Sequence, residues 1–371
     1  MRKIVIGGST GSIGAKALSV IDDHPDDLKV HALIARSRKE IFLAQIEKYR
    51  PAYVIFGEEL QLPGGTKQIP EKEFAEALGH ADLFLNAVSG INGMEYTYIA
   101  LASGKKVALA NKESLVAGFE KMLAACKTPL DLIIPVDSEH SAIFQLLSGV
   151  RSDDVEKVIL TASGGKIRNK DLNRELLPQE ILEHPKWRMG SVITIDSSTM
   201  VNKAYETAEA HYLFNVPLKN IEVLFHPQAV IHGMIKMKDK NIFAHLSPTD
   251  MMYPIKHALF YPNRVPYEKD FNYSVISELT LEPVNFNYYP NYGLFTEALQ
   301  KSPKTRTALI CGNERSVDHF LRSRIKFTQI FELNRYIYEH WKDQGDLEFG
   351  ELPEIRSKVD TIIENYFGGI Q

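Results

Sequence analysis

The first 110 residues alternate between short apolar runs and amphipathic segments. Apolar runs bounded by polar or turn residues predict buried strands, which we place at residues 3–6, 28–34, 52–56, 82–85 and 106–110. Helical periodicity at residues 15–21 and 94–102 separates some of these runs. Strands that alternate with helices in this way predict a parallel, doubly wound sheet.

The rest of the chain predicts a second sheet and a helical C-terminal part. Apolar runs predict strands at 132–134, 155–161 and 192–195, and a mostly antiparallel or mixed sheet from 221–225, 230–237 and 242–246. Helices are expected at 141–147 and within 196–211, the second with Ser197 or Ser198 as its N-cap. A further helix ends near Phe260. Residues 261–292 predict a surface connector, and helices follow at 315–325, 327–341 and 353–366.

Composition narrows the class of protein. A chain of 371 residues exceeds one ordinary core, and 44% hydrophobic with 24% charged residues is typical of a soluble globular protein. The net charge of -4 does not favour nucleic acid or a membrane surface as a partner. Two distant cysteines, Cys126 and Cys311, indicate a reducing compartment and small core residues. With no transmembrane-length run and a strand starting at Lys3, we expect a cytoplasmic, soluble protein.

The first strand runs directly into a glycine-rich turn, residues 7–14, and then into a helix. Gly8 and Gly11 allow main-chain N–H groups to approach a pyrophosphate, while Gly14 permits close helix–strand packing. The spacing G-x-x-G-x-x-G is a variant of the dinucleotide fingerprint, and both flanks have the required context. We therefore expect cofactor contacts at residues 10–13, namely Thr10, Gly11, Ser12 and Ile13.

The end of the second strand favours one dinucleotide over the other. Residues 35–38, Ala-Arg-Ser-Arg, lack the acid that usually binds the ribose of NAD. An arginine at this place suits a 2′-phosphate, so Arg36 and Ser37 predict NADPH rather than NADH. The alternative is that Arg36 and Arg38 simply face solvent. Asn111 and Glu113, after the strand at 106–110, are expected near the nicotinamide, and Asn111 is also suited to cap a helix.

Candidate catalytic residues concentrate between residues 131 and 247. Residues 135–140 deliver two carboxylates and a histidine from a strand into a helix start, where helix capping is the favoured local interpretation. Asn202, Lys203, Glu206 and Glu209 share one helical face beside small alanines, which favours a ligand cradle over a ladder of ion pairs. The turn at 162–165 suits an anion. In the loop at 184–190, a tryptophan predicts either a lid over a ligand or local packing.

Six motifs in order resemble the 1-deoxy-D-xylulose 5-phosphate reductoisomerase family, and the resemblance spans the whole chain. They are residues 8–14, 110–114, 135–140, 161–165 and 184–187, and the group formed by Asn202, Lys203 and Glu206. The resemblance implies a homodimeric enzyme that rearranges a phosphorylated sugar and reduces the product with NADPH, using Mg2+, Mn2+ or Co2+. The rearrangement proceeds either by direct migration or by retro-aldol and aldol steps. The product would be 2-C-methyl-D-erythritol 4-phosphate, an isoprenoid precursor.

The same resemblance implies roles for individual residues. Three carboxylates would bind the metal: Asp137, Glu139 and Glu206. The substrate phosphate would contact Ser163, Ser197, Asn202 and Lys203, with His184 beside it. Lys112 and Ser138 would contact substrate hydroxyls or metal-bound oxygens, and Trp187 and Met189 would belong to a mobile flap. We also expect a cofactor contact at Gly190. Residues 35–38 depart from the family, where a glycine is common.

Together these patterns predict an α/β protein of several parts. An N-terminal Rossmann-type NADPH-binding domain is expected at 1–130 and a central α+β catalytic and dimerisation domain at 131–260. A connector at 261–292 and a small helical domain at 293–371 would follow. The rival enzyme is a semialdehyde or homoserine-type dehydrogenase, but neither cysteine lies in a nucleophile turn. A non-catalytic NADPH-binding regulator, with the three carboxylates as helix caps and ion-pair partners, is the alternative of another class.

Overall fold

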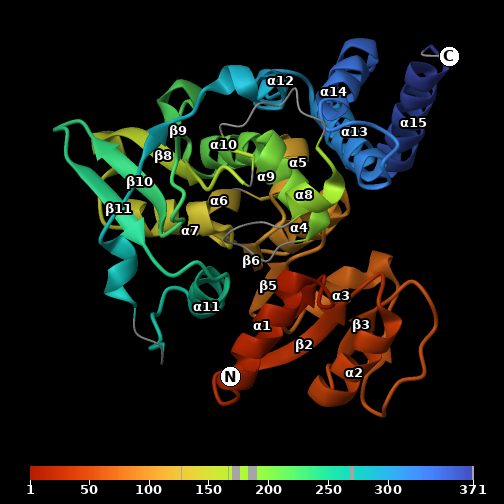
Figure 1. The fold of residues 1–371 in the computed structure, drawn as a ribbon. Helices are drawn as coiled ribbons and strands as arrows, with labels where there is room; N and C mark the ends of the chain where they lie inside the picture. The colour runs from red at the N-terminus through yellow and green to blue at the C-terminus, as the bar shows by residue number, and fades with distance from the viewer. Residues whose placement is uncertain (127, 166, 169–175, 183–189, 268–270, 370–371) are drawn as a thin grey trace. The chain divides into compact units, whose positions relative to one another are not determined.

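The computed structural model describes residues 1–126, 128–165, 167–168, 176–182, 190–267 and 271–369, which form two compact units (Figure 1). The first unit comprises residues 1–114, 119–141 and 250–270. The second comprises residues 115–118, 142–249 and 271–371. This division differs from the four segments expected from the sequence, because residues 250–270 return to the first unit. The four-part division stays a prediction.

The first unit is built on a parallel sheet with the strand order β4-β3-β2-β1-β5-β6-β7. Its strands are β1 (Arg2–Gly7), β2 (Leu28–Ile34), β3 (Tyr53–Ile55), β4 (Lys67–Gln68), β5 (Leu83–Asn86), β6 (Lys106–Leu109) and β7 (Ile133–Pro135). Its helices are α1 (Ser12–Asp23), α2 (Lys39–Tyr49), α3 (Phe74–Leu78), α4 (Met94–Ala102), α5 (Lys112–Ala125), α6 (Pro129–Leu132) and α11 (Met252–Phe260). Apart from β4 at its edge, this is the order of a dinucleotide-binding sheet.

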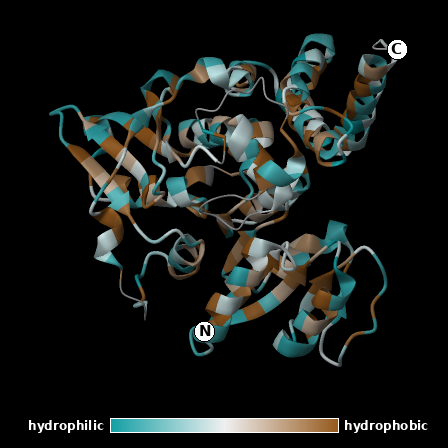
Figure 2. Cartoon of the chain, viewed as in Figure 1, coloured by the Kyte–Doolittle hydropathy of each residue, from teal (hydrophilic) through white to brown (hydrophobic). Residues whose placement is uncertain are grey.

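Burial explains why these runs form strands. Ile4, Val5 and Ile6 of β1 are all fully buried, as expected for a central parallel strand covered on both faces. The strands of this sheet are largely brown in Figure 2, whereas its helices alternate between brown and teal. Each strand predicted in residues 3–110 coincides with a strand of this sheet, and the predicted doubly wound α/β architecture is confirmed.

The second unit contains a mixed sheet with the order β11-β10-β8-β9-β12. The strands are β8 (Val155–Ala162), β9 (Ile221–Phe225), β10 (Ile231–Met237), β11 (Ile242–Leu246) and β12 (Glu282–Pro283). Only β8 and β9 pair in parallel among these strands, so the predicted mixed sheet is confirmed. Ile143 of α7 (Ser138–Leu147) and Ala210 of α10 (Val201–Phe214) share one hydrophobic cluster with the residues of β8 and β9.

Helices complete the second unit. They are α8 (Pro178–Leu182), α9 (Ser191–Thr199), α12 (Pro290–Ala298), α13 (Pro303–Leu321), α14 (Gln329–His340) and α15 (Leu352–Gly368). The last three pack against one another, drawn in blue in Figure 1. The expected connector therefore ends sooner than predicted, since α12 begins inside it, and α13 begins at Pro303 rather than at residue 315. In the described part of the chain, no helix has the length and apolarity needed to cross a membrane.

Three further sequence-based predictions are wrong. Residues 192–195 are not a strand but part of α9, in which Thr194 N–H donates to Gly190 O. The run Val-Ile-Thr-Ile has high strand propensity, and tertiary packing overrides it. Ser197 and Ser198 are consequently interior to α9, and the next helix begins after Met200, which has a left-handed φ of 63°. Cys311 is buried as expected, but Cys126 is partly exposed.

Candidate active site

The glycine turn after β1 is built by two close approaches. Gly8 has φ +74°, and a Cβ there would lie 2.2 Å from the main-chain oxygen of Ala87, after β5. A Cβ on Gly14 would lie 2.3 Å from the oxygen of Gly8. Gly11 N–H donates to that same oxygen at 2.9 Å. The turn thus lies against the helix start of α1 with no room for side chains, the geometry that lets main-chain N–H groups meet an anion.

The two arginines after β2 have different partners. Arg38 Nη1 donates to the main-chain oxygen of Thr10 at 2.9 Å, and Thr10 Oγ1 donates to Ser37 O at 3.4 Å. These bonds tie the end of β2 to the glycine turn. Arg36 forms a two-pronged pair with Glu71, both hydrogen bonds being 3.1 Å. Both side chains of that pair are about half exposed, so the pair stabilises the fold little and leaves Arg36 accessible to an anion.

Asn111 and Lys112 follow β6 at the carboxyl edge of the sheet. Asn111 is the N-cap of α5, accepting from Ser114 N–H, and its Nδ2 donates to Val88 O at 2.7 Å and Gly90 O at 2.6 Å. Glu113 Oε2 accepts a further bond from it at 3.2 Å. Lys112 is buried and ion-paired with Asp137. The cap therefore fixes the loops after β5 and β6 and aims Lys112 at the end of β7.

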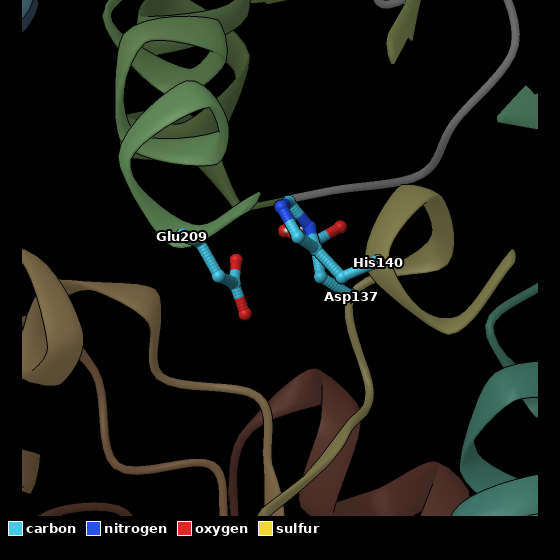
Figure 3. Close-up of side chains that lie close together, drawn as sticks. All are labelled: Asp137, His140 and Glu209. Atoms are coloured by element: carbon cyan, nitrogen blue, oxygen red, sulfur yellow. Dashed lines mark ion pairs between the residues drawn. The ribbon is translucent and has the colours of Figure 1, made fainter. Parts of the chain in front are cut away.

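Carboxylates come together around the start of α7 and the middle of α10. Asp137, Glu139 and Glu206 offer ligand atoms that all lie within 4.8 Å of one another. A second group, Asp137, His140 and Glu209, has the same property. Figure 3 shows Asp137 and His140 at the start of α7, with Glu209 extending from α10. The capping interpretation holds at the same time, because Ser141 N–H donates to Asp137 O at 2.8 Å as the helix begins.

The face of α10 expected to form a cradle is buried rather than solvated. Lys203 and Glu206 form an ion pair, with 4% and 1% of their surfaces exposed. Lys203 Nζ also donates to Thr161 O at 2.6 Å, and Asn202 Nδ2 donates to Glu206 Oε1 at 2.5 Å. Buried charges are costly, so a buried pair with these added hydrogen bonds favours a functional role over a stabilising one.

Tyr292 of α12 lies beside this face. Its hydroxyl is 3.2 Å from Thr207 Oγ1, which in turn donates to Lys203 O. Burial raises the pKa of Tyr292, while the hydrogen bond to Thr207 and the nearby charge of Lys203 act in the opposite direction. The tyrosine is therefore a neutral hydroxyl next to the lysine.

A second glycine turn follows β8. Gly164 and Gly165 have φ of +76° and +58°, and a Cβ on Gly165 would lie 2.9 Å from Ser198 Oγ. Ser198 is buried, and its Oγ has no hydrogen-bond partner among the described residues. Gly165 N–H donates weakly to Ser163 Oγ at 3.4 Å. This turn thus brings two hydroxyls and main-chain N–H groups to one place, a set of donors suited to a phosphate.

The structure places the remaining expected residues as follows. Ser197 is half-buried on α9 with its Oγ donating to Ile193 O at 2.8 Å, and Gly190 is the N-cap of that helix. Ser138 bonds to Glu139. His184, Trp187 and Met189 lie outside the described residues. His226 is a buried core histidine: its Nδ1 lies 2.8 Å from Thr280 O, and burial lowers its pKa.

Sequence reasoning missed the contributions of Ser198, Thr207 and Tyr292. The sequence indicates Ser198 only as a helix cap, because residues 192–195 predict a strand. Tyr292 lies 85 residues from Thr207, and no local pattern joins them. The signal that was available was the placement of two serines after an apolar run and shortly before Asn202.

The donor set fits a hard divalent cation. Oxygen ligands from Asp137, Glu139 and Glu206 suit Mg2+ or Mn2+ and do not suit a structural zinc site. Glu206 is buried, and Lys203 balances its charge. Lys112 does the same for Asp137. The two lysines thus offset the repulsion between the clustered carboxylates.

Comparison with known proteins gives consistent matches along the chain. The family model described as 1-deoxy-D-xylulose 5-phosphate reductoisomerase matches residues 4–118. The model of its C-terminal domain matches residues 133–214, and one described as DXP reductoisomerase C-terminal domain matches residues 246–361. The 1-deoxy-D-xylulose 5-phosphate reductoisomerase of Persephonella marina is 38% identical, over 89% of this chain and 88% of that protein.

Solved structures give the same result. One, described as DOX-P reductoisomerase in complex with NADPH, fosmidomycin and magnesium, superposes with a TM-score of 0.87 at 28% identity and covers 98% of each chain. The enzyme of the same name from Zymomonas mobilis, in complex with NADPH, has equal TM-score, identity and coverage.

Proposed function

The chain belongs to the 1-deoxy-D-xylulose 5-phosphate reductoisomerase family, and from that premise we propose that it converts 1-deoxy-D-xylulose 5-phosphate to 2-C-methyl-D-erythritol 4-phosphate with NADPH and a divalent metal ion. The observation that supports this most directly is the grouping of Asp137, Glu139 and Glu206 next to a buried lysine. One related structure is described as a complex with NADPH, fosmidomycin and magnesium, and the Zymomonas mobilis structure as a complex with NADPH.

The glycine turn and the end of β2 are proposed to bind the cofactor. Main-chain N–H groups of residues 10–13 at the start of α1 would meet the pyrophosphate. Arg36, Ser37 and Arg38 lie where a 2′-phosphate would be recognised, although Arg36 has to exchange Glu71 for it. Asn111, Glu113 and Gly190 are kept as further proposed contacts. NADPH supplies a hydride for the reduction of the rearranged aldehyde.

Asp137, Glu139 and Glu206 are proposed to hold the metal ion. When bound, the ion supplies Lewis acidity that stabilises negative charge on the substrate's ketone and hydroxyl oxygens. Lys112, which is ion-paired with Asp137, is proposed to donate to a substrate oxygen; this ion pair supports the proposal. Ser138, at the start of α7, would orient a hydroxyl.

The substrate's phosphate is assigned to the second glycine turn and the start of α10. Ser163, Ser197, Asn202 and Lys203 are the proposed contacts, with His184 beside them and Trp187 in a covering segment. Ser198 extends this set, because its buried Oγ faces Gly165. Lys203, which also pairs with Glu206, would donate a charged hydrogen bond to the phosphate, and the neutral hydroxyl of Tyr292 nearby adds no negative charge to oppose it.

The rival dehydrogenase chemistry is not favoured. A semialdehyde dehydrogenase needs a thiolate, and burial raises the pKa of Cys311 to about 12. A non-catalytic regulator would not require Lys203 and Glu206 to be buried together at this cost.

We also propose a homodimer in a reducing, cytoplasmic compartment. Strand β11 is an edge of the mixed sheet, and Ile242, Phe243 and Leu246 on it are 55%, 46% and 36% exposed. An exposed apolar edge strand is a liability in a monomer and a natural contact for a second copy of the chain.

An assay of NADPH oxidation with 1-deoxy-D-xylulose 5-phosphate, with and without Mg2+, tests the function. We expect the absorbance of NADPH to fall only when Mg2+ is present. Glu206→Gln should abolish this oxidation, because a neutral amide replaces one anionic ligand. Glu139→Gln is the companion variant, since Glu139 is only half-buried and we expect its change to disturb the fold less than Glu206→Gln does. Glu222→Gln, on a half-exposed pair with Lys157, is the matched control and should keep full activity.

Two outcomes would contradict the proposal. Absence of metal-dependent oxidation in the unaltered protein would remove the assigned activity. Full activity in both carboxylate variants, with NADPH affinity and circular dichroism unchanged, would remove the metal site while leaving the cofactor domain intact.

A further inference from the structure

A chain of buried side-chain amides links the C-terminal helices to α9. Asn334 on α14 donates to Asn313 Oδ1 at 3.0 Å, and Asn313 on α13 donates to Asp196 Oδ1 at 2.8 Å. Ser316 Oγ donates to Asn334 Oδ1 at 2.8 Å. The second N–H of Asn334 is used by Asn291 Oδ1 at 3.1 Å. We call these five residues the amide relay.

The relay has one direction. Each amide oxygen along it accepts from the preceding group and each amide nitrogen donates to the next, so hydrogen bonds run from Ser316 through Asn334 and Asn313 to Asp196. Asp196 is the last acceptor, and its carboxylate oxygen Oδ1 accepts the hydrogen bond from Asn313 on α13. The four uncharged members are at most 4% exposed, and Asp196 is 7% exposed. Reversing or removing one member would leave neighbouring buried groups without partners.

The relay ends beside the residues assigned to the substrate phosphate. Asp196 directly precedes Ser197 and Ser198 on α9, and Ser198 Oγ faces the glycine turn at Gly165. At its other end, Asn291 directly precedes Tyr292, which lies 3.2 Å from Thr207 on α10. The relay therefore contacts α9 directly and is attached to α10 through α12.

The relay is better explained by a role in fixing the arrangement of the helices than by a contribution to the stability of the fold. Burying five polar groups is no more stabilising than an apolar core of the same shape. A satisfied polar network does, however, specify one arrangement of the helices that it joins. A glycine at 312 supports close docking, because a Cβ there would lie 2.7 Å from Ile337 Cδ1 on α14.

We propose that Asn313 and Asn334 are positioning residues that hold α9, through Asp196, where its serine hydroxyls can bind the phosphate of the substrate. This inference rests on the proposed function. It gives the C-terminal helices, which lie outside the catalytic groups, a part in substrate recognition. Phosphate binding should therefore respond to changes in the relay, whereas cofactor binding should not.

Asn313→Asp is the primary test, because it keeps the shape of the side chain but removes the N–H that Asp196 accepts. We expect the KM for the sugar phosphate to rise about tenfold or more, with kcat changed less than threefold and the KM for NADPH unchanged. The matched control is Asn365→Asp, the same change on the exposed face of α15, and it should leave all three constants as they are.

A charge swap separates positioning from general loosening. In the double variant Asp196→Asn with Asn313→Asp, the hydrogen bond between α9 and α13 is restored with donor and acceptor exchanged. We expect the double variant to reverse most of the rise in KM for the sugar phosphate, which a merely destabilised fold would not show. Asn334→Ala should behave as Asn313→Asp does, since it removes the donor to Asn313.

Failure of this inference is distinguishable from failure of the proposed function. If the unaltered chain oxidises NADPH with the sugar phosphate but Asn313→Asp has unchanged KM, or loses kcat alone, the relay does not position the phosphate site. If the unaltered chain has no such activity, calorimetric titration with inorganic phosphate decides. Weaker binding in Asn313→Asp that the double variant restores would support the inference, and equal binding in all three proteins would overturn it.

Discussion

Replacing Gly14 by alanine tests the cofactor turn, because two physical effects predict opposite signs. In a helix interior, alanine is favoured over glycine by about 0.5–1 kcal/mol. At Gly14, however, the new Cβ would lie 2.3 Å from the oxygen of Gly8 and 2.6 Å from the Cα of Ser9. Both contacts are to main chain, which has no flexible end to move aside.

The size of the effect follows from these distances. To bring the closest contact from 2.3 Å to the 3.0 Å below which real Cβ atoms are essentially not found, the helix and the turn must separate by about 0.7 Å. Forcing an extra methyl group into a packed site costs about 1–3 kcal/mol. After the gain in helix propensity, we expect a net loss of about 1–2 kcal/mol. The turn that moves is the one expected to bind the pyrophosphate, so NADPH affinity should fall about tenfold.

Gly293→Ala is the matched control. Gly293 also lies in a helix, α12, but nothing lies within 4 Å of the Cβ position, so the same change should stabilise the protein and leave NADPH binding unaltered. Urea unfolding followed by circular dichroism and fluorescence titration with NADPH measure the two effects. If Gly14→Ala stabilises the protein as Gly293→Ala does, with unchanged NADPH affinity, the close approach of turn and helix is refuted.

Two other features of the fold give measurable predictions. Phe243→Glu, on the exposed edge strand β11, should convert the proposed dimer to a monomer, as measured by light scattering. The control Tyr273→Glu, at a site 75% exposed, should leave the dimer intact. Dimers in both variants would exclude this edge as the dimer contact. Burial and the nearby Arg264 lower the pKa of His257 to about 4, so unfolded chains bind a proton between that value and 6.5 while folded ones do not. The free energy of unfolding should therefore decline as the pH falls from 6.5 toward 4. In urea unfolding, His257→Gln should make this decline with pH less steep, whereas the control His340→Gln, at an exposed site, should not. An identical pH dependence in both variants would contradict the assignment.

The sequence allowed the parallel sheet to be predicted because its strands are short apolar runs that are largely buried, except for the edge strand β4 (Lys67–Gln68), which is polar and was not predicted. The same reasoning failed at residues 192–195. Their β-branched side chains suit a strand, but Ile195 packs in the core of the second unit while Val192 is 44% exposed, as helical geometry dictates. Local propensity describes what a segment prefers alone, and here tertiary contacts decide.

The candidate site could be predicted where residue types cluster in sequence and not where partners are distant. Asp137 and Glu139 lie two residues apart, and Lys203 and Glu206 lie on one helical face. Each pair can therefore be recognised from its own segment of the sequence. Asn313 and Asp196 are separated by 117 residues and have no shared period or motif. Likewise, nothing near Arg36 indicates that Glu71 will pair with it. Such contacts depend on the fold as a whole.

On the proposed assignment, α10 joins the groups that bind the phosphate to one of the metal ligands. Asn202 and Lys203, which are assigned to the phosphate, both bond to the carboxylate of Glu206, which is assigned to the metal ion. Because these side chains share one face of one helix and are bonded to one another, the two sets of proposed contacts cannot shift independently. A change at Asn202 or Lys203 should therefore alter the position of the Glu206 carboxylate as well as the contacts to the phosphate.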